Sequence, residues 1–283
     1  MKLQSWMYRT LTFIIAVPAV VAVIIFDYGN HLAANLVIIA ASAIGTMEVG
    51  DFFRKAGYEI SAYLLPIYGA ILPLSTYLEI IEFLPKHTFS IVFTIIISLI
   101  FIRQIFWVKE KQLTLILSRI AANITVVVYP GFFFAFITRL TGLNHPTAAL
   151  LTICLIVFAN DTFAYILGML FGRDTKNVTP ISPNKSLTGF ISGIVAGMGV
   201  AYISYLFSPG LYQEGGLILA LILGFVLSLT AIIGDLIESA MKRSVDKKDS
   251  GTIIPGRGGI LDSVDSLILC APLFYYILFF IGG

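Results

Sequence analysis

Long apolar stretches separated by short polar connections run along the whole chain. A helix needs about 20 predominantly apolar residues to cross the hydrocarbon core of a bilayer. Stretches that approach this length lie near residues 10–26, 32–49, 61–81, 89–108, 113–138, 146–171, 189–207, 216–240 and 262–281. The pattern predicts an all-α, polytopic membrane protein with about nine transmembrane helices.

Three of these stretches bear on the helix count. The first has a basic start but lacks a small-residue cleavage site, so we expect the first transmembrane helix here and not a removed signal peptide. The fifth contains Pro130, and the third contains Pro66 and Pro73. Kinked membrane helices tolerate proline where neighbouring groups satisfy the freed backbone. The sequence leaves open whether the number of transmembrane spans differs by one from nine, chiefly at residues 113–141.

The composition excludes an ordinary soluble domain. Hydrophobic residues make up 58% of the 283 residues and charged residues 12%, about half the charged fraction of a soluble protein. Cys154 and Cys270 both fall inside apolar runs, which indicates small packing residues and neither a disulfide framework nor a zinc site.

The basic residues are distributed unequally between alternate connections. With nine spans and the N-terminus inside, 15 of the 18 Lys and Arg residues fall on the N-terminal side. Only Lys86 and Arg139 fall opposite, and Arg119 lies within the fifth span. The positive-inside rule then predicts that the N-terminus and the loops 172–188 and 241–260 are cytoplasmic.

Several ionisable residues interrupt the apolar spans. Asp161 lies in the middle of the sixth span, Asp235 and Glu238 end the eighth, and Asp262 and Asp265 open the ninth. Such groups cost a few kcal/mol each on insertion scales, so they usually face a cavity and have a function. A structural interhelical hydrogen bond is the alternative for Asp161.

Helical spacing predicts which of these residues act together. At steps of three and four residues, one face of a continuing helix carries Asp235, Glu238, Ser239, Lys242 and Asp246. Asp262 and Asp265 share a face in the same way. The intervening segment "DSGTIIPGRGG" can turn sharply because of its Pro and Gly residues. We therefore expect two acidic faces that meet at the cytoplasmic boundary.

Carboxylates beside lysines and a glycine-rich turn have a direct chemical meaning. Mg²⁺ takes oxygen ligands, commonly carboxylates and substrate phosphates, while Lys, Arg and backbone amides hold phosphate oxygens. The predicted ligand is a polyphosphate with a metal ion. The alternative is that the basic residues are topology signals and the carboxylates are solvated loop charges.

Two further polar groups lie on the same predicted side. The loop 171–189 contains Lys185 with the hydroxyls of Ser182, Ser186 and Thr188, for which a functional site and an ordinary turn are both open. At the end of the second span we expect a structural, interfacial ion-pair cluster formed by Glu48, Asp51 and Arg54.

These residues resemble the C-terminal signature of the phosphatidate cytidylyltransferases, also called CDP-diacylglycerol synthases. The matching positions, with every spacing kept, are Gly234-Asp235-Leu236, Ser239, Lys242-Arg243, Lys248-Asp249, Gly251, Pro255-Gly256-Arg257-Gly258-Gly259 and Asp262-Ser263-Val264-Asp265. Upstream, Asp161, Ala164-Tyr165, Gly168, Phe171-Gly172 and the segment "SPNKSLTG" resemble two further family elements.

The chain departs from the family pattern at three positions. Arg257 stands where the family usually has His, Ser263 where it has Arg, and Thr188 where it has Glu. These departures bear on the catalytic rate and on the choice of substrate. A cytidylyltransferase that acts on another lipid phosphate, such as an isoprenoid ether lipid, therefore stays open.

The resemblance implies an enzyme that converts CTP and phosphatidate into CDP-diacylglycerol and pyrophosphate with Mg²⁺, with a second metal ion left open. The implied catalytic residues are Asp235, Lys242, Lys248, Asp249, Asp262 and Asp265, and of these the four aspartates are the implied metal ligands. The implied substrate-binding residues are Asp161, Ser182, Lys185, Ser239, Arg243, Gly256, Arg257, Gly258 and Gly259.

The resemblance also implies an organisation and a location. We expect N-terminal transmembrane helices over 1–145 and a catalytic transmembrane region over 146–283, in a bacterial cytoplasmic membrane with the active site facing the cytoplasm. No nucleic-acid partner is expected, and a homodimer stays open. A transporter is the rival from another class, although no internal repeat is evident and the charges cluster at one side. A CDP-alcohol phosphotransferase is disfavoured because its acidic motif is absent.

Overall fold

The computed structural model describes residues 15–106 and 114–282, and within these ranges the regular structure is helical. No strand forms there, and β pairing is limited to the isolated bridges Lys176–Ser186 and Ile254–Gly258. The all-α prediction is therefore confirmed for the described part of the chain. Residues 1–14, with the start of the first predicted span, and residues 107–113 lie outside it.

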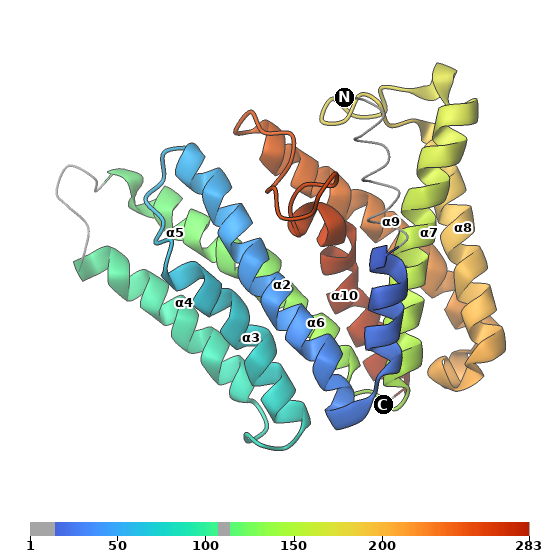
Figure 1. The fold of residues 1–283 in the computed structure, drawn as a ribbon, viewed down its shortest axis with the longest axis horizontal. Helices are drawn as coiled ribbons and strands as arrows, with labels where there is room; N and C mark the ends of the chain where they lie inside the picture. The colour runs from blue at the N-terminus through green and yellow to red at the C-terminus, as the bar shows by residue number, and fades with distance from the viewer. Residues whose placement is uncertain (1–14, 107–113, 283) are drawn as a thin grey trace. The chain divides into compact units, whose positions relative to one another are not determined.

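The helices follow the predicted apolar stretches (Figure 1). Their bounds are Ile15–Ile25, α2 Tyr28–Lys55, α3 Leu64–Ile80, α4 Thr88–Phe106, α5 Ile116–Val126, the π-helix η2 Val127–Phe132, α6 Phe133–Leu140, α7 Pro146–Phe171, α8 Leu187–Phe207, α9 Gly216–Arg243 and α10 Leu261–Gly282. Short 3₁₀ turns occur at Arg173–Thr175, Pro209–Leu211 and Gln213–Gly215.

Seven helical segments in the described residues are long and apolar enough to cross a membrane, with α5, η2 and α6 counted together as Ile116–Leu140. Their lengths and composition are those of an integral membrane protein. Ile15–Ile25 and Leu64–Ile80 are apolar but shorter, and they coincide with the first and third predicted spans. The count of nine crossings and the orientation of the N-terminus stay predictions.

The chain divides into two compact units, and neither is a continuous segment. The first comprises the described residues up to Arg139 together with Ser244–Ser263, and the second comprises Leu140–Arg243 and the described residues from Val264 onward. The predicted division into 1–145 and 146–283 concerns function and stays a prediction.

In the first unit, α2 packs against α3 and η2, and α3 packs against α4 (Figure 1). The buried cluster between these helices contains Leu72, Phe89, Ile96, Ile100, Val127 and Ala135. Pro130 lies within the π-helix, where proline removes a backbone donor. The hydroxyl of Ser42 donates to the carbonyls of Gly69 (2.6 Å) and Pro130 (3.3 Å), so a side chain satisfies groups in this distorted region.

In the second unit, α8 packs against both α7 and α9 (Figure 1). Small residues allow the close approach: Gly189, Gly193 and Gly197 are buried along α8, and a Cβ at Gly193 would lie 2.6 Å from Asn160 Oδ1 of α7. Cys270 of α10 donates its thiol to the carbonyl of Leu227 in α9 (3.2 Å). Cys154 and Cys270 are free and buried, as the sequence predicted.

Candidate functional site

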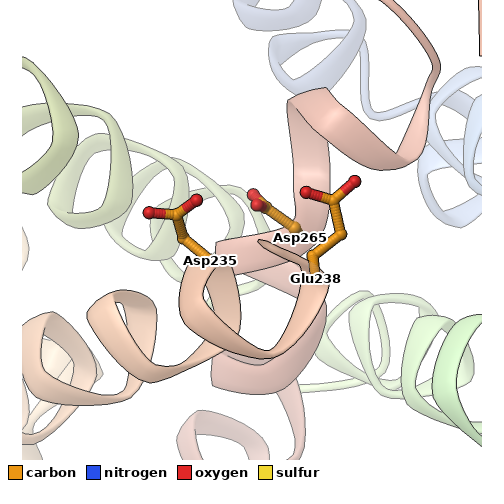
Figure 2. A group of neighbouring side chains, drawn as sticks. All are labelled: Asp235, Glu238 and Asp265. Atoms are coloured by element: carbon orange, nitrogen blue, oxygen red, sulfur yellow. The ribbon is translucent and has the colours of Figure 1, made fainter. Parts of the chain in front are cut away.

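Three carboxylates meet between α9 and α10 in the second unit, and we call Asp235, Glu238 and Asp265 the acidic cluster (Figure 2). One oxygen from each carboxylate lies within 4.8 Å of the others. Asp235 and Glu238 are adjacent on α9 because they are one helical turn apart. Gly234 lets α10 approach, since a Cβ there would lie 2.9 Å from the carbonyl oxygen of Asp265.

Two lysines neutralise most of the charge of the acidic cluster. Lys185, which precedes α8, forms an ion pair with Asp235, and Lys242 forms one with Glu238 a turn earlier on α9. Glu238 is fully buried and Asp265 is 8% exposed, whereas the Asp235 side chain is 32% exposed. Three carboxylates and two ammonium groups leave a formal charge of −1 in a largely buried site.

The loop before α8 positions Lys185. The side chain of Ser186 caps α8 by accepting a hydrogen bond from the Gly189 amide (3.1 Å), and the Lys185 amide donates to the carbonyl of Ser182 (3.1 Å). Burial lowers the pKa of Lys185 from its usual value, although the charges of Asp161 and Asp265 oppose this shift. The lysine is therefore a partly desolvated cation, which binds anions more strongly than an exposed lysine does.

The second polar group belongs to the first unit, and we call residues 244–260 the glycine loop. Asp262 Oδ2 accepts hydrogen bonds from the Ser250 amide (2.7 Å) and the Gly259 amide (2.8 Å). Gly258 has a φ of 114°, in the left-handed region that favours glycine. A Cβ at Gly258 would lie 3.0 Å from the Cβ of Asp249. The fold thus brings Asp249 and Asp262 to the same glycine.

Glu48 of α2 anchors the glycine loop, a role that sequence reasoning missed. Its carboxylate accepts hydrogen bonds from the amides of Ile260 (3.0 Å) and Leu261 (2.8 Å) and from the Ser250 hydroxyl (2.9 Å). Glu48 therefore caps the N-terminus of α10, where backbone N–H groups lack helical partners. The prediction that Glu48 joins an ion-pair cluster is wrong, because no ion pair of Glu48 occurs among the described residues.

The predicted ion pair between the other two members of that cluster is confirmed. Arg54 forms an ion pair with Asp51, three residues before it on α2.

The expectation that the α9 stripe continues to Asp246 is wrong, because α9 ends at Arg243 and Asp246 has a left-handed φ of 52°.

The other predicted site residues lie at partly or fully exposed positions. Asp161 is exposed on α7 and accepts a hydrogen bond from the side-chain amide of Asn160 (3.2 Å). Ser239 is half-buried on α9. The exposed residues at the end of α9 and in the glycine loop are Arg243, Lys248, Asp249, Gly256 and Arg257. The substrate roles of these residues stay predictions.

The acidic cluster fits a divalent metal ion. Ligand oxygens about 2.0–2.1 Å from Mg²⁺ are separated by at most about 4.2 Å, so the observed limit of 4.8 Å needs only small side-chain movements. Asp235 and Asp265 were predicted as metal ligands, whereas Glu238 was predicted only to share the helix face. Its spacing from Asp235 was the available signal, and its burial could not be seen in the sequence.

Several bacterial proteins named phosphatidate cytidylyltransferase are similar to this chain. The Staphylococcus saprophyticus protein is 40% identical over 143 residues, which is 50% of this chain and 52% of that protein. The Bacillus subtilis protein is 36% identical over 156 residues (53% and 55%), and the Synechocystis protein is 39% identical over 135 residues (47% and 44%). The chain thus spans about half the length of the curated relatives it matches.

The match to a family model is more extensive. The model of the cytidylyltransferase family matches residues 7–281, a range that contains the acidic cluster, both of its lysines and the whole glycine loop. The chain belongs to the cytidylyltransferase family.

Proposed function

We propose that this protein transfers the cytidylyl group of CTP to phosphatidate and releases pyrophosphate, so that CDP-diacylglycerol forms. The observation that carries the proposal is the family match over residues 7–281. It is supported by the names of the similar proteins and by the acidic cluster with its two lysines, which suits the binding of a metal and polyphosphate.

The reaction joins two anions. An oxygen of the phosphatidate phosphate attacks the α-phosphorus of CTP, the bond from that phosphorus to the bridging β-oxygen breaks, and pyrophosphate leaves with the electron pair. A phosphate monoester is mostly dianionic at pH 7 because its second pKa is about 6, so no general base is needed. The protein must instead reduce the repulsion between the reacting phosphates.

The charged side chains suit this requirement. We propose that Asp235 and Asp265 hold Mg²⁺, with Glu238 as a further candidate ligand. Metal binding by Asp249 and Asp262 stays a prediction from the family resemblance. Bound Mg²⁺ neutralises phosphate oxygens and acts as a Lewis acid.

The proposed partners of the phosphate oxygens are basic residues of the same segments. In this scheme Lys185 and Lys242 exchange their carboxylate partners for the phosphates, and Arg243 and Lys248 add positive charge. The flexible stem of a lysine allows such an exchange without backbone movement.

The topology that we propose has nine crossings and a cytoplasmic N-terminus. The seven long apolar helices and the two shorter ones coincide with the nine apolar stretches of the sequence, and the basic residues are concentrated on one side. In a bacterial cytoplasmic membrane, CTP would then enter from the cytoplasm while the acyl chains of phosphatidate stay in the bilayer.

The test is incubation of the purified protein with labelled CTP, Mg²⁺ and phosphatidate. A chloroform-soluble cytidine product and stoichiometric pyrophosphate release are expected. Absence of both would refute the function. An isoprenoid ether lipid phosphate in place of phosphatidate tests the choice of lipid, and phosphatidate-independent uptake of solute into proteoliposomes would indicate a carrier.

The assignment of the site is tested separately. Asp235→Asn and Asp265→Asn are each expected to lower Mg²⁺-dependent turnover at least about 100-fold, because each removes a charge at the reacting phosphates. Asp174→Asn is the matched control, since Asp174 is exposed in a 3₁₀ turn. Unchanged turnover in both site variants would remove the acidic cluster from the mechanism and leave the function standing.

A further inference from the structure

A cavity of about 440 Å³ opens in the first unit where α2 and α4 end and α5 begins. Its charged lining consists of three arginines and one carboxylate, namely Arg54, Arg103, Arg119 and Glu59. Its volume lies within the usual range for sites that bind small molecules. No residue of the acidic cluster or the glycine loop lines it, so the proposed reaction leaves it unexplained.

The three arginines differ in how their charge is compensated. Arg119 is buried and pairs with the exposed Glu59 (3.0 Å). Arg54 directs Nε and Nη2 at Asp51, but its Nη1 is buried and has no hydrogen-bond partner among the described residues. Arg103 is partly exposed and has no ion-pair partner in the described ranges. The lining therefore carries an excess of positive charge and a buried donor that is not satisfied.

These properties are those of an anion site. Guanidinium groups present several N–H donors in a plane and bind phosphate in a bidentate manner. A buried N–H group without a partner costs free energy that an anionic acceptor would recover. We propose that this cavity binds a phosphate-bearing anion.

The surface of α4 indicates where the phosphate comes from. Exposed apolar side chains recur every three or four residues along one face of this helix, at Ile91, Ile95, Leu99, Ile102 and Ile105. Such a stripe faces lipid in a membrane helix. It reaches the turn that carries Arg103, so an acyl chain can lie along α4 while its phosphate lies among the arginines. This arrangement favours the headgroup of an anionic phospholipid over a soluble phosphate.

The test uses the full-length protein in phosphatidylcholine nanodiscs. Phosphatidylglycerol is titrated into the discs, and the lipid retained by the protein is counted by native mass spectrometry. Arg103→Gln is expected to weaken retention about tenfold, because it removes a charge-assisted hydrogen bond. Its removal leaves no buried carboxylate unpaired. Arg173→Gln is the matched control, since Arg173 is exposed on a turn outside the cavity.

A variant that is expected to strengthen lipid retention separates a binding role of the arginines from a structural one. Glu59→Gln removes the carboxylate that competes for Arg119, so it is expected to tighten retention severalfold. A purely structural pair would give weaker or unchanged retention in this variant, which would count against the proposal.

Inorganic pyrophosphate in pure phosphatidylcholine discs distinguishes the source of the phosphate. Retention of phosphatidylglycerol that depends on Arg103 supports a lipid site, and pyrophosphate binding that depends on Arg103, without such retention, supports a soluble ligand in the same cavity. If neither probe binds the wild type more tightly than the Arg54→Gln, Arg103→Gln double variant, or if Arg173→Gln weakens binding equally, the proposal is refuted. Phosphatidylglycerol is not a substrate of the proposed reaction, so this failure would leave that function untouched.

Discussion

The change Glu48→Gln tests how the glycine loop is held. Glu48 is 4% exposed, and its two oxygens accept hydrogen bonds from the amides of Ile260 and Leu261 at 3.0 and 2.8 Å. The hydroxyl proton of Ser250 is shared, because Ser250 Oγ lies 2.9 Å from both Glu48 and Asp262. The glutamine side chain is almost the same size, so the substitution changes charge and acceptor number with little change in packing.

The expected loss of stability follows from these contacts. One oxygen becomes an NH₂ donor that faces a backbone N–H, so one hydrogen bond to a charged group is lost at about 1.5–3 kcal/mol. The other bond becomes neutral and loses roughly half its strength, about 1 kcal/mol. The total is about 2.5–4 kcal/mol, which corresponds to a fall in Tm of about 5 °C for a chain of 283 residues.

Thermal unfolding of the purified protein in detergent measures this effect. The matched control is Asp51→Asn, the same chemical change one turn later on α2, where a half-exposed ion pair with Arg54 contributes at most about 1 kcal/mol. Phosphatidate-dependent CTP turnover is also expected to fall in Glu48→Gln, because the glycine loop carries Lys248 and Asp249. Equal Tm values for the two variants would refute the capping role of Glu48.

Three further predictions concern the glycine loop, the acidic cluster and the metal ion. Gly259→Ala is expected to unfold the glycine loop, because its Cβ would overlap the Ser250 hydroxyl and lie 2.5 Å from a Glu48 oxygen; limited proteolysis checks this, with Gly199→Ala, which has open space, as the silent control. Lys242→Gln is expected to destabilise the second unit by about 3–5 kcal/mol, because it leaves the fully buried Glu238 without its ion pair; a Tm equal to the wild type would contradict this. Chelation by EDTA is expected to abolish CTP turnover, and Mg²⁺ in excess to restore it; turnover that persists after exhaustive chelation would exclude a metal-dependent reaction.

The helices were predictable because the apolar pattern of a membrane protein is strong. A stretch of about 20 apolar residues can satisfy its backbone in lipid only as a helix, and each predicted stretch corresponds to a helix in the described residues. The end of α9 was not predictable in the same way. The polar segment after Arg243 has no apolar period, so the sequence does not show that the helix stops before the left-handed turn at Asp246.

The site was predictable where its members are neighbours on one helix. The spacing of Asp235, Glu238 and Lys242 gave the stripe on α9, and the ion pair of the last two confirms it. Glu48 carried no such signal, because its partner Ser250 lies 202 residues away in the sequence. The arginine cavity was missed for a similar reason: its arginines lie on α2, α4 and α5, and the sequence does not show that these parts of the helices meet.

Some carboxylates of the two polar groups are held by backbone amides and others by lysine side chains. This difference indicates which carboxylates can exchange their partners for a metal ion. Glu48 and Asp262 accept hydrogen bonds from backbone amides, and these donors cannot leave without unfolding the glycine loop. Asp235 and Glu238 pair with lysine ammonium groups, which can swing away on flexible stems when phosphates arrive. The same helix α10 supplies Asp262, which the loop amides hold, and Asp265, which belongs to the acidic cluster (Figure 2). This contrast predicts that Asp235→Asn lowers turnover with little change in Tm, whereas Asp262→Asn lowers both; the reverse pattern would contradict the reasoning.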